Sequence, residues 1–488
     1  MEYETVIGLE VHAQLLTRSK MFCSCSTDYA DAPPNTHVCP VCLGMPGVLP
    51  TINRQAIEYA IMTALALNCT IAEHTRFDRK NYPYSDLMKG YQISQYDNPL
   101  SHDGWLAIEV EGGERRIGIT RVHQEEDVAK LWHRTEPATG ETYSLVDVNR
   151  AGVPLMEIVS EPDLRSPEEA RQYLMKLRSI LQYLGVSTGN MEEGSFRCDA
   201  NISIRPLGNG GSTVKVEVKN MNSFKAVYRA LEYEVERQRK VLEKGGKLVQ
   251  ETRGWVEEKG ATVSQRSKEY AHDYRYFPEP DLPPLTISRE MVEELRSRLP
   301  ELPDDRRDRF MSQYGLSRYD ANLLTASRAQ ADYFESCLEL FPGGEGEKKA
   351  KTVANWLLGE YARLFNVTET EITECRVEPR HLVEMLGLIG EGTLSTTMAK
   401  AVFEEMFHSG RHAPEIVQEK GLAQVSAASE LEAVVAQVLA DNAQAVADYR
   451  QGREQALKFM VGQVMRATRG QANPQVVNEM LVKKLEEG

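Results

Sequence analysis

Four cysteines lie within twenty residues near the start of the chain, in the order Cys23-x-Cys25 and, thirteen residues later, Cys39-x-x-Cys42. Two close pairs joined by a loop suit the four thiolates of a tetrahedral zinc site, and a site with four protein ligands is structural rather than catalytic. Four reduced thiols, or a site degenerate in this chain, fit the same spacing. A disulfide is disfavoured, because eight cysteines in 488 residues are too dilute for a secreted disulfide framework.

A second group of residues combines carboxylates with an imidazole. Residues 9–15 alternate as a strand does, with Glu10, His12 and Gln14 on the polar face. The run Gln124-Glu125-Glu126-Asp127 follows another strand-like stretch at 116–123. These groups suit a hard divalent cation such as Mg²⁺, which proteins usually hold together with substrate phosphates, so ATP chemistry is the obvious use. A single Glu-x-His on a strand is more often a surface ion pair, so the interpretation depends on its neighbours.

Cations beside hydrogen-bonding side chains recur along the first half of the chain. The clusters are Arg79-Lys80-Asn81-Tyr82, Lys89-Gly90-Tyr91-Gln92, Asn149-Arg150-Ala151-Gly152, Arg197-Cys198-Asp199-Ala200-Asn201 and Lys219-Asn220-Met221-Asn222. Phosphoryl transfer requires such clamps, because its catalysis is mostly positioning and stabilisation of charge. The sequence has no GxxxxGK[ST] loop, no GxGxxG after a strand and no GxSxG elbow. An ATP site would therefore lie on a sheet, and a nitrogen donor would have to come from elsewhere.

The elements that must position these groups read as an α+β fold. Short alternating strands, also at 201–205 and 214–219, predict an antiparallel sheet with its apolar face on helices and its polar face open as a basin. Ser166 and Pro167, followed by acids, predict the start of a helix over 166–184. The prolines in 281–285 mark the best domain boundary, after which the chain is mostly helical.

The C-terminal part carries a local excess of positive charge. Apolar residues at helical spacing predict two amphipathic helices, over 431–439 and 457–465. Residues 450–484 hold seven cations and two acids, 7 − 2 = +5, in a chain whose net charge is 57 − 72 = −15. This patch is the natural place for RNA, although a solvated helix face explains the charge equally well. The overall acidity argues against a protein that coats nucleic acid nonspecifically.

The chain is expected to be cytoplasmic and to lack a membrane anchor. No run approaches the roughly 18 apolar residues of a membrane span, and the start of the sequence is acidic where a signal peptide would be basic.

Eight ordered motifs closely resemble those of the GatB family, whose members are the B subunit of the bacterial tRNA-dependent amidotransferase GatCAB. They lie at 6–15, 78–82, 89–95, 149–154, 157–163, 194–201, 217–224 and 272–278, and residues 452–485 resemble the YqeY-type helical tail of that family. The resemblance implies a glutamine-synthetase-like catalytic cradle over 1–290 with a zinc knuckle at 23–42, a helical linker domain over 291–410 and a tRNA-binding tail over 411–488.

The resemblance also implies a reaction. The enzyme would be a glutamine-hydrolysing carbon–nitrogen ligase that uses ATP to activate Glu on tRNA(Gln) or Asp on tRNA(Asn) as an acyl phosphate and then amidates it. Ammonia would come from glutamine hydrolysis on the partner GatA, with the small partner GatC clamping GatA and GatB together in a heterotrimer. The missing amidase nucleophile agrees with this division of labour.

Motif positions carry the family's site residues onto this chain. Glu10, His12 and Glu125 would hold Mg²⁺, and Lys80 and Arg197 would join them in catalysis. Contacts to ATP, the aminoacyl end or the intermediate would come from Tyr82, Glu126, Asn149, Arg150, Asp199, Asn201, Lys219 and Asn220. The four cysteines would bind structural Zn²⁺, and tRNA would contact Arg450, Arg453, Lys458, Arg466 and Arg469.

Two other functions stay open on the sequence alone. The chain could be a tRNA-binding scaffold whose ATP chemistry sits on a partner, in which case the basic patch would matter and Glu10 and His12 would not. It could also be a stand-alone ligase for small carboxylic acids, which would act without tRNA or a partner.

Overall fold

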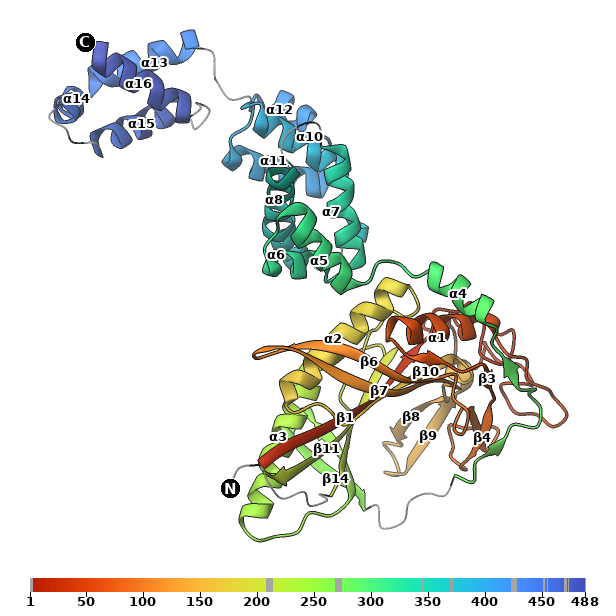
Figure 1. Cartoon of the computed structure of the whole chain (residues 1–488). Helices are drawn as coiled ribbons and strands as arrows, with labels where there is room; N and C mark the ends of the chain where they lie inside the picture. The colour runs from red at the N-terminus through yellow and green to blue at the C-terminus, as the bar shows by residue number, and fades with distance from the viewer. Residues whose placement is uncertain are drawn as a thin grey trace. The chain divides into compact units, whose positions relative to one another are not determined.

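The structure is a computed structural model that describes residues 3–207, 214–267, 274–341, 343, 346–368, 370, 372–422, 428–450, 453, 455–468, 472 and 474–487. The chain divides into two units, Met1–Pro303 and Asp304–Gly488 (Figure 1). The first unit is mixed α+β and the second is helical, so the predicted α+β part followed by a helical part is confirmed.

Strands dominate the described part of the first unit. They are β1 (Tyr3–Gln14), β2 (Thr70–Ile71), β3 (His74–Thr75), β4 (Asp78–Asn81), β5 (Tyr91–Ser94), β6 (Ser101–Val110), β7 (Gly113–Glu126), β8 (Lys130–Thr135), β9 (Thr142–Asp147), β10 (Pro154–Ser160), β11 (Phe196–Pro206), β12 (Val216–Lys219), β13 (Glu251–Val256), β14 (Ala261–Ser267), β15 (Phe277–Pro278) and β16 (Leu285–Thr286). Short 3₁₀ helices η1 (Val148–Arg150) and η2 (Glu257–Lys259) interrupt them.

A large sheet within these residues positions the polar groups. Its strand order is β14-β13-β12-β11-β1-β10-β7-β6-β2, so β1 lies near the middle, between β11 and β10. Neighbouring strands are antiparallel, as predicted, except for β12 and β13, which are parallel. The exception has a simple cause: helix α3 (Phe224–Glu243) connects these two strands, and a helical crossover is the usual connection between parallel neighbours.

Helices cover the apolar face of this sheet. Helices α1 (Arg54–Ala66), α2 (Pro167–Leu184) and α3 share one buried core with the alternate strand residues Leu9, Val11 and Ala13 (Figure 1). The predicted helix start is confirmed, because the Ser166 side chain accepts a hydrogen bond from the Glu169 N–H and Pro167 is the first helical residue. The opposite face of the sheet is therefore left to the polar residues of the same strands.

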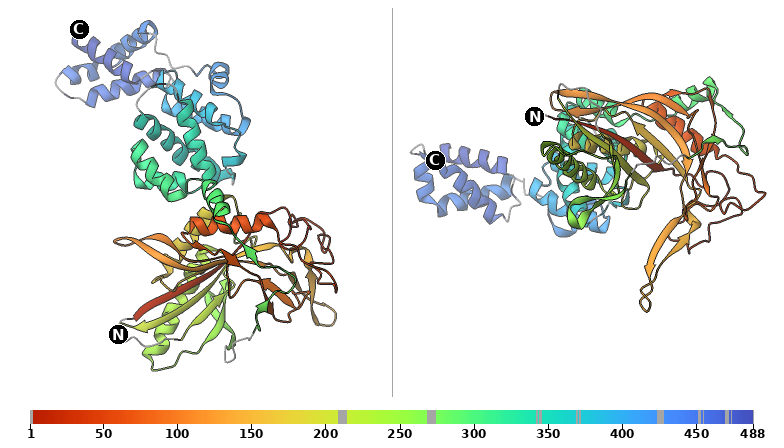
Figure 2. Two further views of the ribbon diagram at one scale, coloured as in Figure 1. Left: turned by 45° about the vertical axis from the view of Figure 1, so that its right-hand side comes forward. Right: turned by 90° about the horizontal axis from the view of Figure 1, so that it is seen from below.

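Smaller sheets lie at the edge of the polar face. Strands β15, β4 and β5 form a three-stranded antiparallel sheet, which joins residues near 80 and 93 to residues near 277. Strands β8 and β9 pair as a hairpin that projects from the rest of the first unit (Figure 2). Strands β3 and β16 pair separately.

The first unit continues past the predicted proline-rich boundary. Helix α4 (Arg289–Ser297) follows that segment, and Leu295 is buried in the same core as the sheet and α1. This unit extends to Pro303, because the amphipathic helix α4 packs its apolar side on the core of the first unit.

The described second unit is built from helices. They are α5 (Pro303–Tyr314), α6 (Arg318–Thr325), α7 (Arg328–Leu340), α8 (Gly346–Trp356), the π-helix η3 (Leu357–Tyr361), α9 (Ala362–Thr368), η4 (Ile372–Glu374), α10 (Pro379–Gly390), α11 (Thr396–Ser409), α12 (Ala413–Lys420), α13 (Ala428–Asp441), α14 (Ala443–Arg450), α15 (Gln455–Ala467) and α16 (Pro474–Glu487).

Two separate cores stabilise these helices. One extends from Phe310 to Val417, past residue 410, the predicted end of the linker domain. The other joins α13, α15 and α16 through residues such as Leu431, Met460 and Val464, so both predicted amphipathic tail helices are present.

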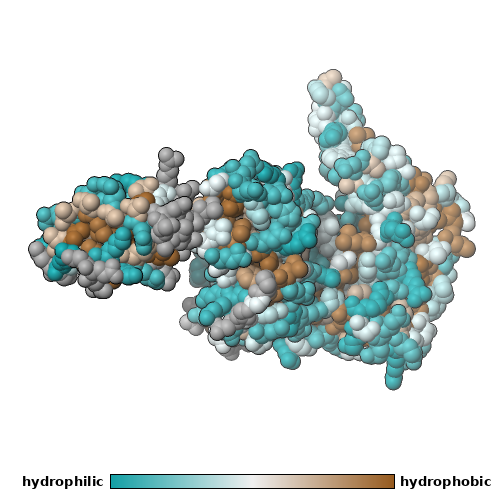
Figure 3. All heavy atoms as spheres, turned by 90° about the horizontal axis from the view of Figure 1, so that it is seen from above, coloured by the Kyte–Doolittle hydropathy of each residue, from teal (hydrophilic) through white to brown (hydrophobic). Residues whose placement is uncertain are grey.

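Hydrophilic residues predominate on the face of the molecule drawn in Figure 3. No helix among the described residues is both long and apolar enough to cross a membrane.

Candidate functional site

A row of polar side chains crosses the centre of the large sheet. His12 on β1 pairs in register with Arg197 on β11 and with Glu157 on β10, and Glu157 pairs in turn with His123 on β7. Register partners in antiparallel strands point to the same face, so these four side chains lie side by side on the polar face. Glu157 separates the two imidazoles, its Oε2 lying 3.5 Å from His12 Nε2 and 3.5 Å from His123 Nε2.

The two histidines of this row have opposite charge preferences. Burial lowers the pKa of His123 to about 4, so this ring is neutral at neutral pH. Burial also works against the charged form of His12, but the hydrogen bond and charge of Glu157 and the charge of Glu125 outweigh it and raise the pKa of His12 to about 9. Glu157 thus stabilises one imidazolium beside one neutral imidazole.

Glu125 completes a group that could hold a metal ion. Its Oε1 lies 3.6 Å from His12 Nε2, and ligand atoms of His12, Glu125 and Glu157 all lie within 4.8 Å of one another. When a metal ion displaces the proton of His12 Nε2, two carboxylates and an imidazole form a donor set that suits a hard divalent cation with places left for phosphate oxygens. Glu10 is two residues before His12 on β1, so the two side chains are neighbours on the same face. Its Oε1 accepts a hydrogen bond of 3.0 Å from Asn201. Glu10 therefore borders the group rather than joining it.

Lys80 lies beside these carboxylates. It extends from β4, and its Nζ lies 5.1 Å from the ring centroid of Tyr274 and 5.7 Å from that of Tyr82. Burial works against the ammonium, but the negative charge of Glu125 outweighs it, so the pKa of Lys80 is raised. Lys80 and Tyr82 thus lie together near Glu125.

Arg197 is held by a buried carboxylate that the sequence did not single out as a site residue. Asp127 Oδ2 lies 2.9 Å from Arg197 Nη2 and 3.8 Å from Arg150 Nε, and it accepts a hydrogen bond of 2.6 Å from Gln14. Burial would raise the pKa of Asp127, but the charges of Arg197 and Arg150 outweigh it and lower the pKa. Asp127 stays ionised and fixes the guanidinium of Arg197 next to His12.

A second polar group lies farther along β11 and β12. Lys219 Nζ donates to Asp199 and lies 3.5 Å from Glu217, while Asp199 pairs in register with Glu10. Asn220 directly follows Lys219 with a positive φ of 64°, where β12 ends. The predicted residues Asp199, Asn201 and Lys219 are therefore brought to the same face as Glu10.

Glu126 and Asn149 lie away from the polar face. Because successive strand residues point to opposite sides, Glu126 points away from Glu125, and it binds Lys89 and the Ile93 N–H beside a cavity of about 230 Å³. Asn149 is buried and bonds to backbone, accepting from the His37 N–H at 2.8 Å and donating to the Pro33 carbonyl at 2.8 Å. Its amide fixes the segment that leads to the second cysteine pair.

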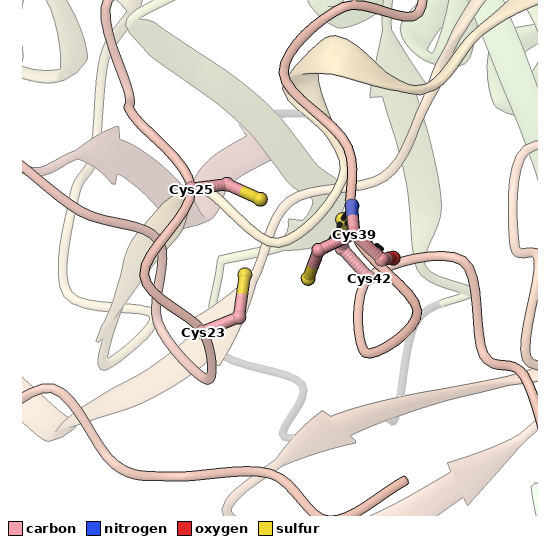
Figure 4. A group of neighbouring side chains, drawn as sticks. All are labelled: Cys23, Cys25, Cys39 and Cys42. Carbon is pink, nitrogen blue, oxygen red and sulfur yellow. Dashed lines mark hydrogen bonds between the residues drawn. The ribbon is translucent and has the colours of Figure 1, made fainter.

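The four cysteines come together as their spacing predicts (Figure 4). Their Sγ atoms all lie within 4.8 Å of one another, and those of Cys39 and Cys42 are 3.9 Å apart. Sulfurs around tetrahedral zinc, with Zn–S bonds of about 2.3 Å, lie about 3.8 Å apart. The hydrogen bond between Cys23 and Cys42 lowers the pKa of Cys42 and raises that of Cys23, so one thiolate of the pair is favoured. The donor set and its spacing fit a zinc ion.

Four of the predicted tRNA-binding residues of the tail are exposed. Arg450 ends α14, and Lys458 and Arg466 extend from α15, whose Met460 and Val464 are buried. Arg453 is exposed and lies 3.1 Å from Asp448. Arg469, like residues 272 and 273 of the eighth motif, lies outside the described residues.

The sequence alone did not assign three central residues to the site: Glu157, His123 and Asp127. Glu157 and His123 belong to strands that are buried on both sides near the site, so no alternation distinguishes the polar face there. Asp127 was visible as part of an acidic run, but its ion pair with Arg197 depends on strands far apart in sequence. The signal that could have found Glu157 is a lone acid within an otherwise apolar strand.

The fold and site define an enzyme chain with an α+β catalytic unit followed by helices. Residues 5–293 match the GatB/GatE catalytic domain family, and residues 332–485 match the GatB domain family. Relatives named as the B subunit of aspartyl/glutamyl-tRNA(Asn/Gln) amidotransferase include that of Dehalococcoides mccartyi strain CBDB1, 61% identical over 100% of both chains. Those of Carboxydothermus hydrogenoformans (57%, 99% of both chains) and Thermomicrobium roseum (56%, 100% of this chain and 99% of the relative) are similar. The chain belongs to the GatB family.

The geometry predicts that Glu157, and not only the residues assigned from the sequence, binds a divalent cation. Glu157→Gln should weaken Mn²⁺ binding at least about tenfold, because it removes a charged oxygen ligand and the partner that holds His12. Free Mn²⁺ measured by electron paramagnetic resonance during titration of the purified chain reports the affinity. Glu161→Gln is the matched control, since Glu161 accepts a hydrogen bond from Thr120 outside the group. Equal affinity in Glu157→Gln and wild type would exclude Glu157 as a ligand.

Proposed function

We propose that this chain is the transamidating subunit of a tRNA-dependent amidotransferase. It would use ATP to phosphorylate the side-chain carboxylate of Glu-tRNA(Gln), Asp-tRNA(Asn) or both, and would amidate the product with ammonia. The observation that carries this proposal is the polar row of Arg197, His12, Glu157 and His123, with Glu125 beside it, inside the span that matches a catalytic domain family. The names of the relatives supply the substrate class.

The residues of the polar face have distinct tasks in this proposal. His12, Glu125 and Glu157 would hold Mg²⁺, with Glu10 next to them, and the ion would offset charge on the transferred phosphoryl group. Lys80 would contact a phosphate oxygen, because its ammonium is held near Glu125 without a carboxylate in direct contact among the described residues. Arg197, fixed by Asp127, would orient the carboxylate that accepts the phosphoryl group.

The attack of ammonia requires an unprotonated amine and a site that excludes bulk water. The buried row supports this requirement, since Glu125, Glu157 and His123 have little exposed side chain. Ammonia would reach the acyl phosphate from the glutaminase GatA, and the small protein GatC would complete the complex. A glutamine-synthetase-like cradle and a cytoplasmic location are part of the same proposal, and the polar sheet face over a helical layer supports the cradle.

The four cysteines would hold a structural zinc ion. The segment they organise is tied to the sheet through Asn149 and through Lys20, whose backbone N–H donates to the Cys25 carbonyl and whose Nζ donates to the His37 carbonyl. Zinc would therefore stabilise the cover of the cavity beside Glu126 rather than take part in catalysis.

A scaffold role without catalysis is the less favoured function. It would leave three features of the first unit without a function: the metal-capable group, the Arg197 guanidinium held by Asp127, and the partly buried Lys80. The exposed cations of the tail support tRNA binding in either case, so they do not separate the two functions.

The activity is tested first at His12. In the chain co-expressed with GatA and GatC, His12→Ala should lower ADP release and amide formation at least about a hundredfold, because the metal loses a ligand. ADP and amide are measured together, with glutamine and Glu-tRNA(Gln).

His133→Ala is the matched control, since His133 lies on the projecting hairpin and bonds to Ser144. ADP release that needs charged tRNA and collapses only in His12→Ala is the expected result. Undiminished release in His12→Ala would move the ATP site off these residues and favour the scaffold function.

The purified wild-type chain should contain about one zinc ion, and Cys39→Ser should lose most of it, because a tetrahedral site then lacks one thiolate. Elemental analysis of the protein gives the stoichiometry. Cys375→Ser removes a cysteine outside the group and should keep the zinc. A wild-type chain free of zinc after expression with added zinc would contradict the assignment.

The tail is tested by its salt dependence. Lys458→Gln combined with Arg466→Gln should weaken tRNA binding and lower the slope of log affinity against log salt by about two, one for each lost phosphate contact. The double variant Lys215→Gln with Lys225→Gln removes equal charge from exposed positions of the first unit. Identical slopes in both double variants and wild type would place the tRNA contact elsewhere.

A further inference from the structure

Four tyrosines from three separate segments gather at the edge of the polar face. Tyr82 follows β4, Tyr96 follows β5, and Tyr274 and Tyr276 precede β15. The three strands pair in one small sheet, which brings these segments together. We call these four residues the tyrosine ledge.

The rings of the ledge form a continuous aromatic surface. Tyr96 and Tyr276 are stacked, with ring centroids 4.2 Å apart and planes 8° from parallel. Tyr274 meets Tyr276 edge-on at 6.1 Å and Tyr82 edge-on at 5.7 Å. Such contacts fix ring orientation, because aromatic rings favour offset-stacked and edge-to-face arrangements.

Tyr96 is the outer member of the ledge. It is 52% exposed although one of its faces is covered by Tyr276, whereas Tyr82, Tyr274 and Tyr276 are only partly exposed. Its backbone is also fixed, because the buried Asp78 carboxylate accepts hydrogen bonds from the N–H groups of Tyr96 and Asp97 at 2.9 and 3.2 Å. Tyr96 is therefore a rigid, exposed ring with Tyr276 stacked on one face, and it can stack on an aromatic ring of a ligand.

The ledge borders the residues to which we assign the chemistry. Ser94, two residues before Tyr96, donates to Glu125 at 3.4 Å. Lys80, which we assign to a phosphate, lies over Tyr274 and Tyr82. An aromatic surface, a cation suited to phosphate and a metal-capable group therefore border one another in the site, and the base, phosphates and metal of a nucleotide require these three kinds of group.

We propose that Tyr96, backed by Tyr276, is a stacking platform for the adenine base of a substrate. The proposal rests on the proposed function, which brings two adenosines to this site: that of ATP and the terminal adenosine that carries the aminoacyl group of the tRNA. Both present the same π-face, and stacking on an aromatic side chain recognises that face without reading the hydrogen-bonding edge of the base.

The test separates the ring of Tyr96 from its hydroxyl and from its bulk. In the complex with GatA and GatC, Tyr96→Ala should raise one Michaelis constant about tenfold or more and leave kcat within about twofold. Tyr96→Phe keeps the π-face and should behave as wild type. Tyr96→Leu keeps most of the apolar bulk without a π-face, so it should fold and still raise that Michaelis constant. It therefore carries the test if Tyr96→Ala is poorly folded.

Two titrations identify the source of the adenine. The KM for ATP is measured at saturating Glu-tRNA(Gln), and the KM for Glu-tRNA(Gln) at saturating ATP. A rise in the first alone assigns the platform to ATP, a rise in the second alone assigns it to the terminal adenosine, and a rise in both supports a platform shared by the two. No rise in either, a loss of kcat alone, or a loss in Tyr96→Phe equal to that in Tyr96→Ala would overturn the proposal.

Tyr319→Ala is the matched control, since Tyr319 is 72% exposed on α6 of the other unit. It should leave both Michaelis constants unchanged. A wild-type complex that forms no amide would refute the proposed function itself. An active wild-type complex with unaltered Tyr96→Ala would refute only the platform.

Discussion

The register of β1 between β10 and β11 is the constraint on which the rest of the site depends. Because side chains alternate along a strand, this register places His12 beside Arg197 and Glu157 and at the same time buries Leu9, Val11 and Ala13 against the helices. A slip of one residue would exchange the two faces, removing the polar row and exposing the core. The same hydrogen bonds between β1, β10 and β11 therefore determine both the burial of the core and the positions of the site residues.

Charge compensation is the second organising feature. The polar face brings several ionised groups out of water, and an isolated buried charge is strongly unfavourable. Three of its cations have a carboxylate in reach: Arg197 has Asp127, His12 has Glu157 and Glu125, and Lys219 has Asp199. His123 instead stays neutral, so this residue of the row adds no buried charge that would need a partner.

Local patterns in the sequence predicted much of this structure. The alternation of residues 9–15, the Ser-Pro start of the helix at 166–184 and the spacing of the cysteines depend on neighbours in the chain, and all three appear as expected. Features that depend on distant segments did not follow from pattern alone. The parallel pairing of β12 with β13, the place of Glu157 between two histidines and the backbone-binding task of Asn149 required the fold.

The consecutive residues Glu125 and Glu126 give strand β7 a further property. One side chain belongs to the metal-capable group and the other lines the cavity beside the cysteines, so a single extended backbone carries both. A sideways displacement of this strand would therefore move the two carboxylates together. Neither the metal-capable group nor this wall of the cavity can be repositioned alone through the strand they share.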